Sequence, residues 1–370
     1  MTIEDITASN ESGTEYWIAD ALRLEASTFS VLRQPQTPSN WHFEAFQIRE
    51  LRGERGSDVN PQRRGEQYAM VEFWIRSISG DNPAPFSATL SYRRRNAEPI
   101  DLKLAGKLRL VADQRRLQFD PAVVSGSLAN GECRADIALR PITQTAAAPA
   151  PTSSLPTVLN ADLWRRSDWD LNCNLAELAL QGTTFENVSL TSNNLLGNSA
   201  SQLKLPTFFT GTAELNLNVD ASVDSSAAAT SEPRWVISPV IQNAASGPML
   251  NWLQQQNADA PPHPWQGPVS ISGRIETIGN TRPALANHAQ GELTLLSNNG
   301  SVDMTQLKRD IEAPLQELGP LVGDAQEIRD WPDTLEYLTL TGRWVPDGTI
   351  QRLSGKLDEA LYDLRQLQIN

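Results

Sequence analysis

The chain has 370 residues, of which 39 % are hydrophobic and 20 % are charged, and its formal net charge at neutral pH is −13. This composition is typical of a folded protein with room for two or three ordinary domains or one long one. The negative charge argues against a nucleic-acid partner, because phosphate binding needs clustered Lys and Arg.

No apolar run in the sequence approaches the roughly 20 residues of a membrane-spanning helix. The first residues, "MTIEDITASNESGTEYW", lack the basic and apolar regions of a signal peptide. The chain as given therefore predicts a soluble protein without a targeting signal, or a piece of a longer protein from which such a segment is missing.

Three regions follow one another along the chain. Residues 1–141 predict an N-terminal β region, and residues 158–370 predict a second β region with a few short helices. Between them, residues 142–157 consist mainly of Ala, Pro, Ser and Thr without apolar periodicity, which predicts a linker or a long loop.

Within both β regions the dominant hydrophobic period is two. In "DLKLAGKLRLVA", from Asp101, leucines alternate with Asp, Lys and Arg, and "GTAELNLNVDAS" and "PVSISGRIETI" follow the same pattern. Such alternation indicates antiparallel strands with one dry face and one wet face. Gly106 and Gly273 fall within the apolar series, where glycine marks a bend, a bulge or a close backbone approach.

The two cysteines, Cys133 and Cys173, both occupy the apolar side of an alternating stretch. A pair is too few for a disulfide scaffold and has no metal-binding spacing. Two alternatives stay open: buried free thiols, or a disulfide formed in an oxidising compartment. A disulfide needs neighbouring strands with Cα atoms within about 7 Å and would contribute at most about 4 kcal/mol.

Helical patterns are few. Residues 246–256 predict a short helix with Ser246 as its N-cap and a proline in its first turn, and residues 303–319 predict an amphipathic helix. Before the second helix, "AQGELTLLSNNGSVDMTQL" predicts a strand, a turn at "SNNG" and a second short extended piece.

Residues suited to catalysis are scarce. Histidine occurs at three positions, which are His42, His263 and His288. None forms a metalloprotease motif, and the sequence contains no nucleophile elbow, phosphate-binding loop or dinucleotide fingerprint. The "DWD" at 168–170 predicts solvent-facing carboxylates beside Arg165 and Arg166 rather than a metal site. We therefore expect no catalytic residues, no metal and no cofactor, and a protein that is not an enzyme.

Each predicted strand has one apolar face, and the predicted helices are too few to cover these faces. The apolar faces must therefore pack against each other or against a bound molecule. Periodicity alone favours a β-sandwich, in which the faces pack against each other. The alternative is a long, curved, largely antiparallel sheet whose apolar concave face forms an open, taco-like groove for an acyl chain.

The order of these pieces resembles the AsmA-like family of Gram-negative envelope proteins. The likeness is carried by four blocks, at residues 19–48 with an "NW" step at Asn40-Trp41, 100–139, 169–194 with the family's "G…l.nv.l" step, and 235–357. The last block is similar to the family's C-terminal region, in which a short "gPllnwL" helix precedes paired units of strand, "NG" or "DG" turn and strand. Here those units are Gly291 to Gly300 and Gly342 to Gly348.

Proteins of this family are single-span inner-membrane proteins with a large periplasmic part, a long twisted sheet with an apolar channel. The resemblance therefore favours the groove over the sandwich. It implies a non-enzymatic, periplasmic protein attached to the inner membrane through a segment absent from this chain. Such a protein would bind phospholipid or another acyl-chain lipid and support intermembrane lipid transport and outer-membrane biogenesis, with envelope proteins as further candidate partners.

The candidate lining of the groove consists of inward residues of the alternating strands. They are Leu102, Leu104, Leu108, Leu110, Leu171, Leu175, Leu215, Leu217, Val219, Val269, Ile271, Ile275, Leu293 and Leu295. Two other functions stay open: a structural or assembly factor that acts on outer-membrane proteins through its sheet edges, and a glycan-active enzyme on a β scaffold.

Overall fold

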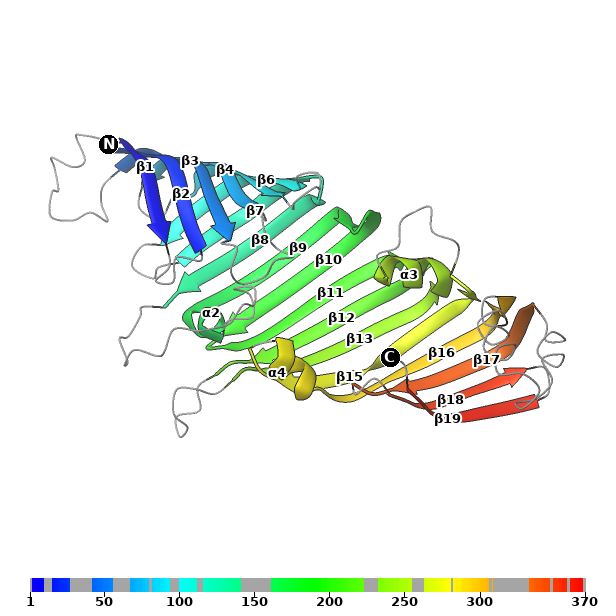
Figure 1. Cartoon of the computed structure of the whole chain (residues 1–370). Coiled ribbons are helices and arrows are strands. Elements are labelled where there is room, and N and C mark those ends of the chain that lie inside the picture. The colour runs from blue at the N-terminus through cyan, green and yellow to red at the C-terminus, as the bar shows by residue number, and fades with distance from the viewer. Residues whose placement is uncertain are drawn as a thin grey trace. The chain divides into compact units, whose positions relative to one another are not determined.

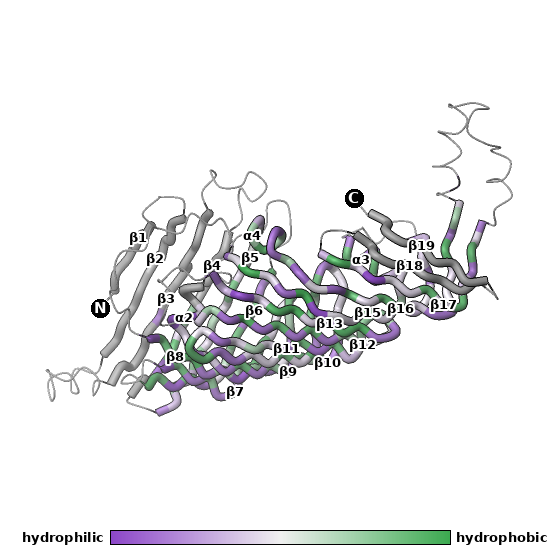
Figure 2. Tube along the Cα trace, turned by 90° about the horizontal axis from the view of Figure 1, so that it is seen from below, coloured by the Kyte–Doolittle hydropathy of each residue, from purple (hydrophilic) through white to green (hydrophobic). Residues whose placement is uncertain are grey.

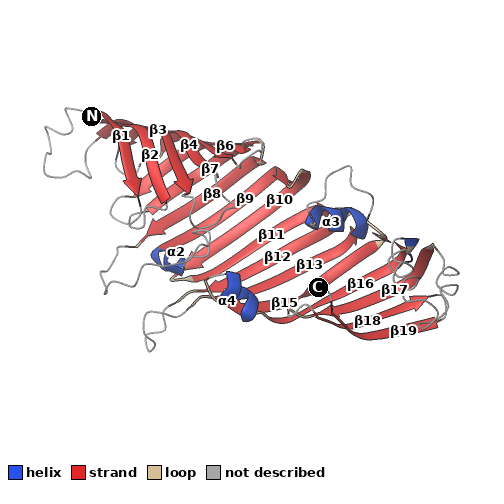
Figure 3. Ribbon diagram, viewed as in Figure 1, coloured by secondary structure: helices blue, strands red, loops and turns tan. Residues whose placement is uncertain are grey.

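The computed structural model describes the greater part of the chain. The described residues are 2–9, 15–26, 42–55, 67–79, 82–93, 100–111, 116–140, 161–222, 232–254, 263–280, 282–305, 308, 333–346, 349–357 and 360–368. They are mainly β strands with a few short helices (Figure 3). Among them, no helix has the length and apolar character needed to cross a membrane.

The chain divides into two compact units, and the division runs along strands β11 (Asn198–Phe208), β12 (Gly211–Asp220) and β13 (Arg234–Ala245). Unit 1 comprises Met1–Lys204, Asn216–Trp235 and Ile278–His288. Unit 2 comprises Leu205–Leu215, Val236–Thr277 and Ala289–Asn370.

The described residues of unit 1 form ten complete strands and two helices. They are β1 (Thr2–Ser9), β2 (Glu15–Ala26), β3 (His42–Arg55), β4 (Gln67–Ser79), β5 (Ala84–Arg93), β6 (Ile100–Val111), β7 (Arg116–Gly126), β8 (Ala129–Leu139), α2 (Ala161–Arg166), β9 (Ser167–Leu180), β10 (Thr183–Leu195) and α4 (Arg282–Asn287). Each strand from β1 to β10 pairs antiparallel with the next in the sequence, and β10 pairs with β11 (Figure 1). This is a meander, the simplest antiparallel connection.

Unit 2 contains the remaining elements, all complete except β15, whose last residue, Ile278, is assigned to unit 1. They are α3 (Ser246–Leu253), β14 (Trp265–Gln266), β15 (Pro268–Ile278), β16 (Gln290–Asp303), β17 (Thr334–Trp344), β18 (Thr349–Leu357) and β19 (Ala360–Gln368). Strands β15 to β19 also pair antiparallel in chain order, and the short β14 pairs with β16.

The prediction of a mainly β, antiparallel fold with few helices is confirmed, and the meander is not closed on itself. Within each unit the described strands form a single sheet, so the two packed sheets of a sandwich are not found among the described strands of either unit. Hydrophobic and hydrophilic positions alternate along the strands (Figure 2), as a period of two requires.

Gly106 marks an irregularity in the sheet, as predicted. The register between β6 and β7 shifts between Ala105 and Lys107, on either side of this glycine. A Cβ atom at Gly106 would lie 2.9 Å from the carbonyl oxygen of Pro121, so a side chain would collide with the neighbouring backbone. The glycine therefore permits the close approach of β7 at a bulge.

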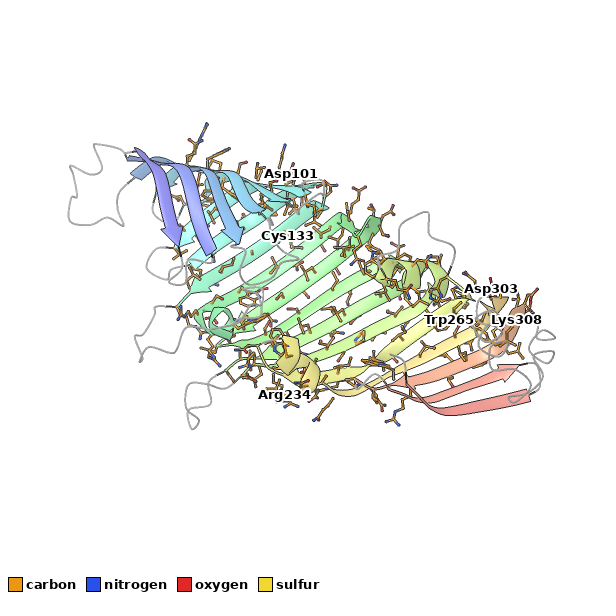
Figure 4. All side chains as sticks on the ribbon, viewed as in Figure 1. Asp101, Cys133, Arg234, Trp265, Asp303 and Lys308 are labelled. Atoms are coloured by element: carbon orange, nitrogen blue, oxygen red, sulfur yellow. A yellow bond between two sulfur atoms is a disulfide. The ribbon has the colours of Figure 1, made fainter. Side chains whose placement is uncertain are left out.

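The cysteines form a disulfide, which decides between the two alternatives that the sequence leaves open. Cys133 in β8 lies directly opposite Cys173 in β9, with their Cα atoms 4.0 Å apart (Figure 4). Residues 141–160 connect these two strands and lie outside the described residues. The predicted linker at 142–157 and the domain boundaries beside it therefore stay predictions.

The turn predicted at "SNNG" is wrong, because β16 runs through it without a break. Asn299 has a φ of 50°, and Gly300 beyond it still pairs with Tyr337 of β17. Asparagine tolerates this left-handed conformation. The register between β16 and β17 is unchanged on either side of Asn299.

Helix α3 confirms the helix predicted near 246–256, but Ser246 is not its N-cap. The capping position belongs to Ala245, and the Ser246 hydroxyl donates instead to the carbonyl oxygen of Trp265, 3.1 Å away. Most of the helix predicted at 303–319 lies outside the described residues.

Candidate functional site

The register of unit 1 defines one continuous face of its sheet. Residues directly opposite each other on antiparallel neighbours point to the same side. Following such pairs from strand to strand gives two rows that begin at β4 and β5. The first row is Phe73, Ala88, Leu104, Val124, Gly131, Leu175 and Val188, and the second is Ala84, Leu108, Phe119, Ala135, Leu171, Ser192 and Ser201.

Two further rows belong to the same face. They are Leu90, Leu102 and Gly126, and Leu110, Leu117, Ile137, Trp169, Asn194 and Ser199. We call these four rows the apolar face of unit 1. The structure thus brings together the predicted lining residues Leu102, Leu104, Leu108, Leu110, Leu171 and Leu175.

One end of the apolar face is a dry core. Ile75, Phe86 and Leu108 are buried there, and the rings of Phe86 and Phe119 meet edge to face with centroids 5.3 Å apart. Leu175 is buried as well, whereas Leu102, Leu104 and Leu171 are half-buried and Leu110 is 38 % exposed. The predicted lining residues therefore divide into a buried floor and an accessible surface.

A tryptophan cluster covers another part of unit 1. Trp164 of α2 packs against Trp169 and Trp235, with ring centroids 4.9 and 5.8 Å apart. Val219 is buried in this cluster, and Leu217 packs against it. These two predicted lining residues therefore belong to a core beneath the tryptophans rather than to an open surface.

The remaining predicted lining residues lie in unit 2. Ile271 is directly opposite Leu295, and Leu293, Val269 and Ile275 share that face through the same register. Val269 is fully buried, and the others are half-buried. Leu215 is separate from this group and is 39 % exposed.

Polar side chains enter the apolar face at β10 and β11. The Trp169 indole N–H donates to the Ser192 hydroxyl at 2.9 Å, and the Ser192 and Ser201 hydroxyl oxygens are 2.8 Å apart. We call Ser192 and Ser201 the serine pair. Sequence analysis missed it, although one signal was present: Ser192 follows Val188 and Leu190 at an inward position of the alternating strand.

Asn194 is a buried polar residue beside the serine pair, and its side chain is 2 % exposed. Its amide nitrogen donates to the carbonyl oxygens of Trp164, 2.7 Å away, and Ser167. These bonds fix the orientation of the amide, because a flipped group would place its oxygen against two other oxygens. The amide oxygen has no hydrogen-bond partner.

Charge is confined to other parts of the sheet, since no residue of the four rows is charged. On the opposite face the Arg116 guanidinium donates two hydrogen bonds to Asp136, at 2.5 and 2.6 Å. These bonds, helped by a bond from Gln118, hold the pKa of the Asp136 carboxyl below its usual range against the opposing effect of burial. The face itself therefore offers no counter-ion to a charged ligand.

The "DWD" segment differs in detail from the prediction. Asp168 accepts hydrogen bonds from the Arg140 guanidinium and from the backbone N–H of Leu196, whereas Arg165 donates to the carbonyl oxygen of Ala221. Asp168 is thus part of a structural network at the end of β9. No group of three or more potential metal ligands occurs within the described ranges.

Comparison with known proteins gives no relative. The chain matches no protein-family model, no curated protein and no solved structure. Functional inference therefore rests on the apolar face, the serine pair and the disulfide.

Proposed function

We propose that this chain is a non-enzymatic lipid-handling module of the Gram-negative cell envelope, which binds an acyl chain on the apolar face of unit 1. The observation that supports this most is the shared register of Leu102, Leu104 and Leu110 on an open, uncharged face. An acyl chain laid on these side chains would gain about 25 cal/mol for each Å² of apolar surface removed from water.

The proposal also covers the shape of the sheet and the compartment in which the chain acts. The sheet would curve around its apolar face to form a groove, and the chain would act in the periplasm at the inner membrane. The Cys133–Cys173 disulfide supports an oxidising compartment. The resemblance to the AsmA-like family supports a role in intermembrane lipid transport and outer-membrane biogenesis.

A matched pair of substitutions tests lipid binding on this face. Leu110 lies on the apolar face, whereas Val123 pairs with Ala105 and Glu132 on the opposite face and is 50 % exposed. Both sites are exposed enough for a carboxylate to remain hydrated, so neither Leu110→Glu nor Val123→Glu should unfold the protein. We expect native mass spectrometry of detergent-free protein to show bound phospholipid on the wild type and on Val123→Glu, and several-fold less on Leu110→Glu.

Equal lipid occupancy in the two variants, or no lipid on the wild type at any phospholipid concentration, would contradict the proposal. An empty wild type would favour the second candidate function, an assembly factor that pairs its free sheet edges with partner chains. The open meander supports that alternative, because an unclosed sheet leaves unpaired edge strands.

A further inference from the structure

The serine pair holds a hydrogen-bond donor that the described structure does not use. The Trp169 N–H is committed to Ser192, and the two hydroxyl groups share a single hydrogen bond between them. Two hydroxyl protons and one shared bond leave one proton free for a third partner, whichever serine is the donor. Both serines are half-buried, so this donor lies on the apolar face at a position that a bound molecule can reach.

A second observation shows that the polar zone around the serine pair is incomplete. Asn194 lies opposite Trp169 and two residues from Ser192, on the same face of the sheet. Its buried amide oxygen lacks a donor, although most buried polar atoms in folded proteins have a partner. The Asn194 oxygen can only accept, so the unused donor at this place is the free hydroxyl proton of the serine pair.

The surroundings restrict the charge of a partner. The neighbouring positions on this face are Leu171, Leu190, Leu203 and Ala135, and none of them is ionisable. An ionised phosphate or carboxylate brought here would lose hydration without gaining a counter-ion. A neutral acceptor, such as a carbonyl oxygen, carries a much smaller desolvation penalty.

We propose that the serine pair donates a hydrogen bond to the ester carbonyl of an acyl lipid bound on the apolar face. This inference rests on the proposed function and names the part of the lipid that the site recognises. The ester group lies between the hydrocarbon chain and the headgroup of a glycerolipid. The face matches this arrangement: the apolar rows from β4 to β9 would hold the hydrocarbon chain, and the serine pair at β10 and β11 would meet the ester group. The charged headgroup would then remain outside the site.

A comparison of ester and ether lipids of equal chain length distinguishes the contribution of this hydrogen bond from that of apolar burial, because only the ester lipid has carbonyl oxygens. We would incubate the full chain with an equimolar mixture of dipalmitoyl phosphatidylcholine and its dihexadecyl ether analogue, which lacks the carbonyl oxygens. Native mass spectrometry then reports the ratio of the two complexes. One additional hydrogen bond predicts a preference for the diester of about 2- to 10-fold.

The variants assign that preference to the serine pair. In Ser192→Ala/Ser201→Ala the ratio should fall to about one, because burial of the chains is unchanged. Ser189→Ala is the matched control, since Ser189 lies on the same strand but pairs with Lys204 on the opposite face, and it should keep the preference. If the double variant fails to fold, Ser192→Cys/Ser201→Ala is the substitute, because a thiol keeps an acceptor for the Trp169 N–H but is a weak donor, and it should lower the ratio.

Each outcome has a separate meaning. A wild type that binds neither lipid contradicts the proposed function itself. A wild type that binds both lipids equally contradicts only the role of the serine pair, and so does a diester preference that survives in the double variant.

Discussion

At the scale of single residues, Leu196 stands out because its backbone conformation is unfavourable for leucine. The turn from β10 to β11 consists of Leu196 and Gly197, with φ angles of 57° and 86°. Only glycine, and to a lesser degree asparagine and aspartate, adopts this region readily. The Leu196 side chain is 60 % exposed, so burial does not offset the strain.

Replacing this leucine should therefore stabilise the protein. We expect Leu196→Asn to raise the free energy of unfolding by about 1 kcal/mol, because asparagine tolerates the left-handed region. Urea denaturation measures this as a higher midpoint with an unchanged slope. Leu195→Asn is the control: this neighbour is 65 % exposed but pairs normally with Asn198, so it should give no gain. A Leu196→Asn midpoint at or below that of the wild type would contradict the strain argument.

A second prediction at this scale concerns His263. Its Nδ1 accepts a hydrogen bond from the backbone N–H of Trp265 at 3.2 Å, and burial lowers the pKa of the imidazole below its ordinary value of about 6.5. The unfolded chain then binds this proton more readily than the folded chain does. The contribution of neutral His263 to the free energy of unfolding is therefore fully present above pH 6.5, and it is lost as the pH falls through the lowered pKa.

The variant His263→Asn retains an acceptor near the Nδ1 position but does not titrate. We expect the difference in unfolding free energy between wild type and variant to change between pH 7 and pH 5, with the wild type losing more stability on acidification. Chemical denaturation at a series of pH values gives this difference. Two parallel pH profiles would rule out a contribution from His263.

At the scale of elements, the Cys133–Cys173 disulfide makes the pairing of β8 with β9 covalent. We expect thiol labelling of the denatured, unreduced protein to find no reactive thiol, and labelling after reduction to find both. The Cys133→Ala/Cys173→Ala variant should lose up to about 4 kcal/mol of stability, because the cross-link closes a long loop in the unfolded chain. Two reactive thiols in protein prepared under oxidising conditions would argue against the bond.

The elements also show how far the sequence predicts this structure. The alternation in β6 and β9 predicts which residues share a side of each strand, and the register places Leu104 and Leu171 on one face of the sheet. The serine pair could not be predicted, because its contact depends on the register between β10 and β11, which no local pattern fixes. The error at "SNNG" has a local cause: Asn299 enters the left-handed region within a strand, where such residues usually indicate a turn.

At the scale of the whole molecule, the lining residues predicted from the sequence have more than one role. Leu217 and Leu215 belong to the same alternating series of β12, yet Leu217 packs against the tryptophan cluster and Leu215 is 39 % exposed. The alternation predicts which side of the strand a residue occupies. It cannot predict that helices α2 and α4 bring tryptophan and leucine side chains to part of that side.

This difference gives a further prediction. Leu217→Glu would place an unpaired carboxylate against Val219 and Trp235, and we expect it to lower the free energy of unfolding by roughly 3 kcal/mol or more. Leu215→Glu, on the same strand, should cost less than about 1 kcal/mol, since its carboxylate can stay hydrated. Thermal or urea denaturation measures both. Equal losses in the two variants would contradict the core assignment of Leu217.

The meander of unit 1 has a consequence for how the chain folds. Because each strand from β1 to β10 pairs with its sequence neighbours, a chain that emerges N-terminus first can add one strand at a time to an existing edge. The step from β8 to β9 joins the two consecutive strands of unit 1 that are farthest apart in the sequence, and the entropic cost of bringing them together grows only slowly with that separation. Once Cys133 and Cys173 are joined, β9 can no longer separate from β8. The disulfide therefore keeps an edge strand in place for β10 and the strands that follow.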